Sequence, residues 1–305
     1  RQRDEQSLLD RCATGADNGD AGVHGAEDRG ISGYQFLMSA TQILANRIRQ
    51  KALKMVHRAK ASHIASALSI TDILAVLYGQ VMHFDPDDQN CVLRDRFILS
   101  KGHACVAVYA TLAEVGLITQ DQTATYGDDF SWLMNHISHK VSGVEFSTGS
   151  LGHGLPFGVG KALAAKARNE TWRSFVLLSD GEMDEGSNWE ALMFAAHQKL
   201  TNLTAIIDYN KLQSLDSVTN TLGLEPLVDK LEAFGCAVYE IDGHDHQQIA
   251  EALSGITHEK PKVIVAHTTK GKGVSFMEDR VEWHYKNPSD EQLTMALAEL
   301  EAAHA

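Results

Sequence analysis

Short apolar runs alternate with helical patterns along most of this chain, and the alternation restricts the possible folds more than any other feature of the sequence. Five such runs are expected to form strands, at 97–100, 175–180, 204–208, 237–241 and 263–267. Each is nearly continuous in its apolar content, so we expect helices to cover both faces of every strand. Helical patterns lie between them, at 155–168, 189–200 and 225–234. The alternation predicts an α/β fold, a doubly wound parallel sheet flanked by helices.

The chain is expected to consist of an arm, one domain and a tail. Residues 1–32 are rich in Gly, Asp and Arg and poor in aromatic residues, which predicts a mobile N-terminal extension. A long amphipathic helix is expected over 33–58, at the start of a single domain that spans 33–285. Residues 286–305 are expected to form a helical C-terminal tail.

The composition argues against several classes of protein and ligand. Of the 305 residues, 44% are hydrophobic and 22% are charged, which is ordinary for a soluble globular protein. The net charge of −13 argues against a general affinity for nucleic acid or for an anionic membrane, although a local nest of backbone N–H groups can still bind an anion. No apolar run of about 18 residues and no signal-peptide pattern occurs, so we expect a cytoplasmic protein. The 15 histidines are the one unusual figure.

Polar residues follow two neighbouring strands where these strands end, and ligands of parallel sheets bind beyond the carboxyl ends of the strands. Asp180 ends one apolar run and is followed by Gly181, and Asn210 comes after the next run. A carboxylate and an amide in such places can turn their oxygens toward one point, and hard oxygen ligands suit Mg²⁺ or Ca²⁺. Gly181 would let the backbone approach a diphosphate closely. Taken singly, the Asp and the Asn are better explained as a helix cap and a turn residue, and only the pair points to a metal.

An Asp-Gly pair followed about 30 residues later by Asn, each after an apolar strand, resembles the metal–diphosphate signature of thiamine diphosphate enzymes. With further segments, the chain resembles the N-terminal, diphosphate-binding half of a transketolase. These segments are Ala61-Ser62-His63, Ser100-Lys101-Gly102-His103-Ala104, Thr148-Gly149-Ser150-Leu151-Gly152-His153-Gly154, Lys270-Gly271-Lys272-Gly273-Val274 and Trp283-His284.

The resemblance implies thiamine diphosphate and Mg²⁺ (or Ca²⁺) as cofactors and assigns roles to individual residues. The metal would be bound by Asp180, Asn210 and the backbone carbonyl of Leu212. The cofactor would be contacted by residues from several loops: His103, Gly149, Leu151, His153, Gly181, Glu190 and Asn210. The catalytic residues would be His63, His136, Glu185 and His284, and histidine suits proton transfer to sugar hydroxyls near neutral pH. In relatives, glutamates that match Glu185 and Glu190 lie at the dimer interface and link the two cofactor sites.

The sequence departs from the family pattern at several positions. Ser179, Lys101, Ser150 and His153 stand where the family commonly has Gly, Asn, Pro and Gln. The family's Gly-His-Pro is missing near residue 136. We align His136 with the histidine of that motif, and His139 stays open as an alternative.

The resemblance covers one domain, whereas the family's cofactor-activating glutamate and most of its sugar-phosphate ligands lie in a second, pyrimidine-binding domain. We therefore expect a split transketolase, in which a separate C-terminal subunit completes an α₂β₂ heterotetramer that acts on sugars or sugar phosphates. Two alternatives are considered. One is an α-type subunit of another thiamine diphosphate enzyme, such as a 2-oxo acid dehydrogenase or a relative of deoxyxylulose-phosphate synthase. The other is a cofactor-binding module without catalysis.

Overall fold

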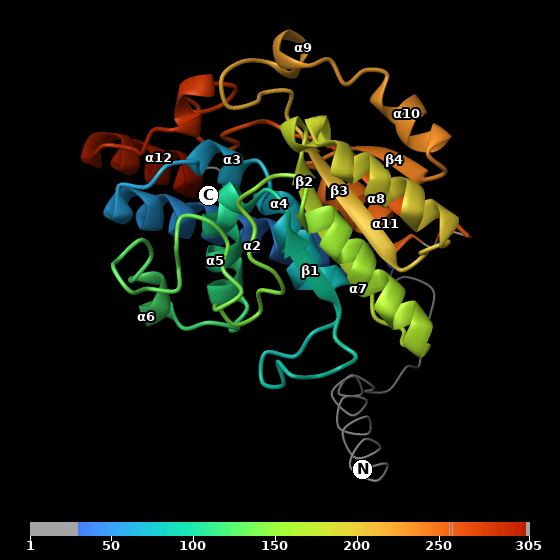
Figure 1. Cartoon of the computed structure of the whole chain (residues 1–305). Helices are drawn as coiled ribbons and strands as arrows, with labels where there is room; N and C mark the ends of the chain where they lie inside the picture. The colour runs from blue at the N-terminus through green and yellow to red at the C-terminus, as the bar shows by residue number, and fades with distance from the viewer. Residues whose placement is uncertain (1–29, 256, 258, 303–305) are drawn as a thin grey trace.

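Five parallel strands form the central sheet of the protein, for which a computed structural model describes residues 30–255, 257 and 259–302 (Figure 1). The strands are β1 (Arg96–Leu99), β2 (Ser174–Ser179), β3 (Leu203–Tyr209), β4 (Ala237–Asp242) and β5 (Lys262–His267). Their order across the sheet is β1-β2-β3-β5-β4. The sequence predicted a strand at each of these five places, and the structure confirms the predicted parallel α/β sheet.

Helices cover both faces of the sheet because side chains along each strand point alternately to opposite sides. Leu177 and Ile206 lie on the face covered by α2 (Gly30–Ala59), α4 (Thr71–Val76), α5 (Cys105–Glu114) and α11 (His246–Ser254). Val176 and Ile207 lie on the face covered by α7 (Gly154–Arg168), α8 (Gly186–His197) and α10 (Leu227–Ala233). Two hydrophobic layers therefore hold the sheet between them.

Short elements connect these layers. They are α3 (Ile64–Leu68), η1 (Leu77–Val81), η2 (Gly102–Ala104), α6 (Gln120–Thr123), η3 (Gly181–Asp184), α9 (Val218–Thr221) and η4 (Val281–His284), and α12 (Asp290–Ala302) is the last helix in the described part of the chain.

Strand β4 differs from what the sequence predicts. Helices α10 and α11 contact it from the two faces of the sheet, as expected, but β4 is an edge strand that pairs only with β5, and its Tyr239 and Glu240 are exposed. The exposure of these side chains was not predicted because an apolar run does not reveal where in the sheet a strand lies.

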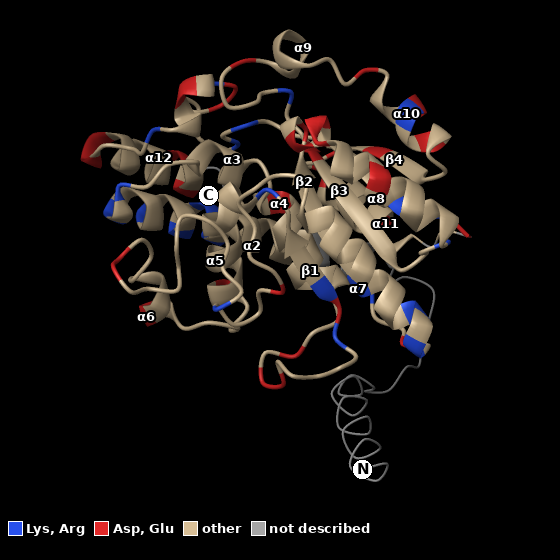
Figure 2. Ribbon diagram, in the orientation of Figure 1, with Lys and Arg blue, Asp and Glu red and all other residues tan. Residues whose placement is uncertain are grey.

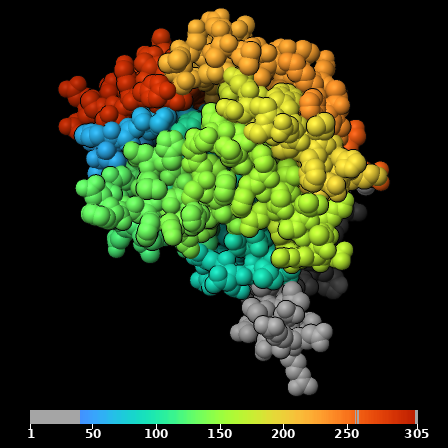
Figure 3. Space-filling view, in the orientation of Figure 1, coloured from blue at the N-terminus to red at the C-terminus, as the bar shows by residue number. Residues whose placement is uncertain are grey.

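The predicted arm and tail have different outcomes. Helix α2 begins at Gly30, earlier than expected, and the predicted mobile extension otherwise lies outside the described residues. Helix α12 lies against α2 (Figure 3). The Asn46 amide of α2 donates a hydrogen bond of 2.7 Å to the carbonyl of Leu300 in α12. None of the described helices is long and apolar enough to cross a membrane.

The parallel arrangement places the carboxyl ends of all five strands at one edge of the sheet. Loops at 100–104, 180–181, 210–214 and 268–273 leave the sheet there, and acidic residues are grouped just after the end of β2 (Figure 2). The loops that carry the sequence motifs therefore meet, although they are far apart along the chain.

Gly158 in α7 lets that helix lie close to β2. A Cβ atom at this position would lie 2.3 Å from Cγ2 of Val176, whereas a Cβ at Gly160 in the same helix has nothing within 4 Å. We expect Gly158→Ala to lower the free energy of unfolding by about 1–3 kcal/mol through overpacking. Gly160→Ala should raise it by about 0.5–1 kcal/mol because alanine is the better helix former. Urea unfolding measures both, and equal stability of the two variants would contradict this packing.

Candidate functional site

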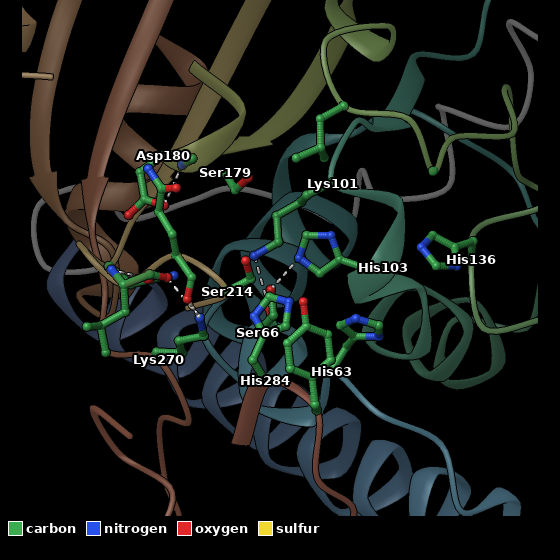
Figure 4. A pocket seen from close by; sticks show the side chains of 17 residues that line it. His63, Ser66, Lys101, His103, His136, Ser179, Asp180, Ser214, Lys270 and His284 are labelled. Atoms are coloured by element: carbon green, nitrogen blue, oxygen red, sulfur yellow. Dashed lines mark hydrogen bonds between the residues drawn. The ribbon is translucent and has the colours of Figure 1, made fainter. Parts of the chain in front are cut away.

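A cleft of about 240 Å³ opens at the carboxyl edge of the sheet (Figure 4). It is lined by His63, Ser66, Lys101, His103, His136, Gly149, Leu151, Ser179, Asp180, Gly181, Asn210, Leu212, Gln213, Ser214, Lys270, His284 and Tyr285. Ten of these residues were predicted from the sequence as site residues. They come from loops that follow β1, β2, β3 and β5 and from the segments around α3 and η4.

Four histidines face one another in the cleft. The ring centroid of His63 lies 5.2 Å from that of His103, 5.9 Å from that of His136 and 5.0 Å from that of His284. His103 also shares a hydrogen bond of 2.9 Å between its Nε2 and the hydroxyl of Ser66. The alternative histidine, His139, is exposed, contacts Ser147 and does not line the cleft.

Burial and neighbouring ammonium groups keep these imidazoles neutral. Burial, the nearby His136 and the ammonium groups of Lys270 and Lys101 lower the pKa of His63 to about 4. Burial and then Lys270 lower the pKa of His284 to about 3, and the pKa values of His103 and His136 are lowered as well, mainly by burial. A neutral imidazole can both accept and donate a proton, so the cluster suits hydrogen bonding to hydroxyl and carbonyl groups.

The position of His63 depends on an unusual backbone conformation. Its φ angle is +70°, in the left-handed region that residues other than glycine rarely adopt. The backbone N–H of His63 donates a hydrogen bond of 2.9 Å to the carbonyl of His284, which joins the two histidine-bearing segments. Such local strain is a recurrent feature of functional sites.

Asp180 is a buried carboxylate without a cationic partner at hydrogen-bond distance among the described residues. Its two oxygens accept from the backbone N–H groups of Gly181, at 2.7 Å, and Lys211, at 2.6 Å. Burial and then the negative charge of Asp208 raise its pKa to about 6. The Oδ1 atom of Asn210 accepts a hydrogen bond of 3.1 Å from the N–H of Leu212. A carboxylate in this setting favours a bound cation.

These oxygens fit a divalent cation only in part. One carboxylate, one amide oxygen and the carbonyl of Leu212 are available, and the described residues contain no group of three or more His, Cys, Asp or Glu side chains arranged for a metal. Mg²⁺ is commonly held by one or two protein groups together with phosphate oxygens and water. The donor set therefore fits Mg²⁺ that arrives with a diphosphate.

Lys270 already contacts part of this donor set. Its side chain is buried, and the ammonium group donates hydrogen bonds of 2.8 Å to the carbonyls of Leu212 and Gln213. Burial and then the charge of Lys101 lower the pKa of Lys270 to about 8. A second cation at the Leu212 carbonyl would have to share this oxygen with the lysine.

One buried carboxylate ties together the loops that carry Gly149, Leu151 and Asp180. Glu182 accepts hydrogen bonds from the Ser100 hydroxyl, from the N–H of Gly152 at 2.9 Å and from the N–H of Ser179 at 3.4 Å. Gly154 lies so close to Ser100 that a Cβ atom there would come within 2.3 Å of the serine oxygen. The glycines of the 148–154 segment thus permit the close contact of two loops.

Three predicted residues do not line the cleft of this chain. Glu185 is the N-cap residue of α8, Glu190 lies on the exposed side of that helix, and His153 is the exposed N-cap residue of α7. Their roles stay predictions.

Several lining residues were not predicted as site residues. Ser66, Lys101, Ser179, Gln213, Ser214, Lys270 and Tyr285 line the cleft. Lys101 and Lys270 stand inside the motifs that carry the resemblance, so their place next to His103 and Gly271 was the available signal. Tyr285 follows His284 directly, and its ring lies edge-on to the rings of His63 and His284.

The histidine cluster should make the protein less stable in weak acid. In the unfolded chain, imidazoles take up protons below about pH 6.5, whereas in the folded protein His63 and His284 stay neutral down to about pH 4 and 3. Protonation therefore favours the unfolded state, and the free energy of unfolding falls as the pH drops below about 6.5. Removing one imidazole by His284→Asn should reduce the loss by up to about 1.4 kcal/mol per pH unit, and by less where water reaches the ring. The raised pKa of Asp180 acts in the opposite direction in both proteins and cancels from the difference.

Urea unfolding at about pH 7 and about pH 5 measures this difference. His197→Asn, on the exposed end of α8 outside the cleft, is the matched control and should keep the wild-type pH dependence. An equal loss of stability in His284→Asn and wild type would contradict the role of the cluster.

Comparisons with known proteins agree with this geometry. Residues 40–298 match the family described as the thiamine diphosphate binding domain of transketolase. A protein of Phocaeicola vulgatus, named as the A subunit of apulose-4-phosphate transketolase, is 41% identical over 261 residues, which is 85% of this chain and 93% of that protein. A protein of the same name from Actinobacillus succinogenes is 44% identical over 259 residues, which is 84% of this chain and 94% of that protein.

The crystal structure of transketolase from Campylobacter jejuni matches with a TM-score of 0.81 at 30% identity, over 86% of this chain and 43% of that chain. This chain thus spans less than half of that transketolase but nearly the whole length of the two apulose-4-phosphate transketolase subunits. It belongs to the transketolase family and corresponds to the thiamine diphosphate-binding, N-terminal domain of that family.

Proposed function

We propose that this chain is the diphosphate-binding subunit of a two-chain, thiamine diphosphate-dependent transketolase, which transfers a two-carbon ketol unit from a ketose or ketose phosphate to an aldehyde. The observation that supports this best is the meeting of Asp180, Asn210 and four neutral histidines in one cleft. The match to the transketolase family favours this reaction over other thiamine diphosphate enzymes and over a module without catalysis.

The chain's own part is to bind the diphosphate end of the cofactor. Thiamine diphosphate, when bound, supplies the nucleophile and the electron sink for breaking the carbon–carbon bond. Asp180, Asn210 and the Leu212 carbonyl would hold Mg²⁺ (or Ca²⁺) against the diphosphate. A Cβ at Gly181 would lie 3.0 Å from the Gln213 side chain, so a larger residue there would require Gln213 to shift.

The histidines would transfer protons to and from the substrate. The Nδ1 atom of His284 is buried and has no hydrogen-bond partner among the described residues, so it is free to bond to a ligand. His63 can take either role because its Nδ1 lies 3.1 Å from the Ser62 hydroxyl, which can donate or accept. His103 is oriented by Ser66 and would contact the cofactor.

The partner would be a separate pyrimidine-domain subunit. Two relatives of nearly the same length are named as one subunit of a transketolase, and a whole transketolase is more than twice as long as the matched region. Glu185 and Glu190 are exposed on α8, as residues at a subunit interface must be in the isolated chain. An α₂β₂ heterotetramer follows as the assembly that we propose, and the cytoplasmic location stays a prediction.

Ketol transfer should require both chains. We expect the purified chain alone to show no turnover with ketose and aldehyde substrates, because the pyrimidine end of the cofactor is left without its domain. Addition of a second polypeptide that matches the C-terminal half of transketolase should restore turnover, measured by aldehyde consumption. Robust turnover by this chain alone would contradict the two-chain proposal.

Asp180→Asn should weaken Mg²⁺-dependent binding of thiamine diphosphate to the two-chain complex by at least about tenfold, equivalent to about 1.4 kcal/mol. The amide keeps the size of the side chain but removes the charge that attracts the metal. Calorimetry measures the affinity at fixed Mg²⁺ concentration. Asp229→Asn, at an exposed position on α10, is the control and should bind as the wild type does. Unchanged binding in Asp180→Asn would refute the metal assignment.

A further inference from the structure

A buried cluster of four charged and polar side chains lies outside the cleft. Asp72 of α4 accepts from both terminal nitrogens of Arg49, at 3.1 and 2.5 Å, from Nδ1 of His244 at 2.7 Å and from Nε2 of His246 at 3.1 Å. The Asp72 side chain is only 7% exposed. The sequence analysis assigned no chemistry to either histidine.

Two members of this cluster also hold the loop 268–273. His244 accepts a hydrogen bond of 2.8 Å at its Nε2 from the N–H of Thr269, and Arg49 donates one of 3.2 Å from its Nε to the carbonyl of Lys272. The two contacts lie on either side of Lys270, the residue of this loop whose ammonium group reaches into the cleft. The cluster therefore restrains the loop by hydrogen bonds at Thr269 and Lys272, on the two sides of Lys270.

The hydrogen bonds of His244 define its tautomer. A backbone N–H can only donate, so the Nε2 atom that contacts Thr269 must be the unprotonated acceptor. The Nδ1 atom then carries the hydrogen and donates it to Asp72. A carboxylate that orients a histidine in this way is a familiar means of setting the direction of the second ring nitrogen.

The loop has little freedom to adopt another course. Gly271 and Gly273 have φ angles of +84° and +90°, and a Cβ at Gly271 would lie 2.4 Å from the carbonyl of Met277. The N–H of Gly271 donates a hydrogen bond of 2.9 Å to the carbonyl of Ala65 in α3. A lysine side chain loses much conformational freedom when it is buried, so a fixed stem is needed for its ammonium group to stay on the carbonyls of Leu212 and Gln213.

We propose that His244, oriented by Asp72, is a positioning residue that sets the backbone at Thr269 and thereby places the Lys270 ammonium group in the cleft, on the carbonyls of Leu212 and Gln213. The inference rests on the proposed function for the identity of the ligand, Mg²⁺ with thiamine diphosphate. The structural part of the proposal, that His244 restrains the backbone at Thr269, requires no ligand.

Two substitutions of His244 separate the two hydrogen bonds of this residue. In His244→Gln the side-chain oxygen can reach the position of Nε2 and accept from Thr269. In His244→Asn the shorter amide can still donate to Asp72 but does not reach Thr269. We expect hydrogen exchange of the peptide that covers 268–273 to be at least about tenfold faster in H244N than in wild type and to differ by less than about twofold in H244Q, because exchange follows local opening.

Calorimetry of the full two-chain complex tests the functional half. H244N should bind thiamine diphosphate with Mg²⁺ about tenfold more weakly, in the range expected for residues that orient a binding group, while H244Q should bind as the wild type does. The double variant H244N/K270M should lose no more cofactor affinity than K270M alone, since both changes remove the Lys270 ammonium group from its place in the cleft.

His246→Asn is the matched control, because it removes a partner of Asp72 that does not contact the loop. It should leave both the exchange of 268–273 and the cofactor affinity within about twofold of wild type, even if the melting temperature falls. Equal losses in H246N and H244N, or wild-type behaviour of H244N, would overturn the proposal. If H244N does not fold, H244S, which also lacks an acceptor within reach of Thr269, takes its place.

Failure of the proposed function gives a different result. If the wild-type complex does not bind thiamine diphosphate with Mg²⁺, the assignment of the ligand is wrong, while the exchange measurements still decide whether His244 holds the loop.

Discussion

The ion pair between Lys101 and Asp208 is the interaction on which the cleft depends. Both side chains are fully buried, and the ammonium nitrogen lies 2.5 Å from Oδ2 of the carboxylate. Burying two charges is costly unless further hydrogen bonds satisfy them. Asp208 meets this condition by accepting also from Ser69, Asn210 and Thr268, and Lys101 by donating to the carbonyl of Ser66. The pair therefore connects the loops after β1, β3 and β5 with helix α3.

The geometry of the other site residues follows from this connection. Burial alone would raise the pKa of Asp208, but Lys101 and the hydrogen bonds lower it below its usual range, so the carboxylate stays charged. A charged Asp208 raises the pKa of Asp180 nearby, and a charged Lys101 lowers the pKa values of His63 and His103. One buried pair thus helps to keep the histidines neutral and the Asp180 site receptive to a cation.

The sequence was sufficient to predict the sheet and most of the cleft, because both depend on local patterns. Apolar runs predicted all five strands, and the rule that ligands lie at the carboxyl ends of strands was enough to bring Asp180 and Asn210 together. The family resemblance added the four histidines. Contacts between distant residues were beyond such reasoning: nothing local in the sequence joins Asp72 to His244, or Glu182 to Gly152. The exposure of Tyr239 and Glu240 on β4 was missed for the same reason, since strand order is a property of the whole sheet.

The charges left unpaired in the cleft indicate the kind of ligand that completes it. Lys101 is neutralised by Asp208, but Lys270 contacts only carbonyl oxygens and Asp180 accepts only from backbone N–H groups, within the part of the chain that the structure describes. Both side chains are buried, so each charge is costly while it lacks a partner of opposite sign. A simple anion would compensate Lys270 and worsen the position of Asp180, and a bare cation would do the reverse. A divalent cation bound to a diphosphate would bring both signs at once and would allow a strongly acidic protein to hold an anionic cofactor at this edge of its sheet.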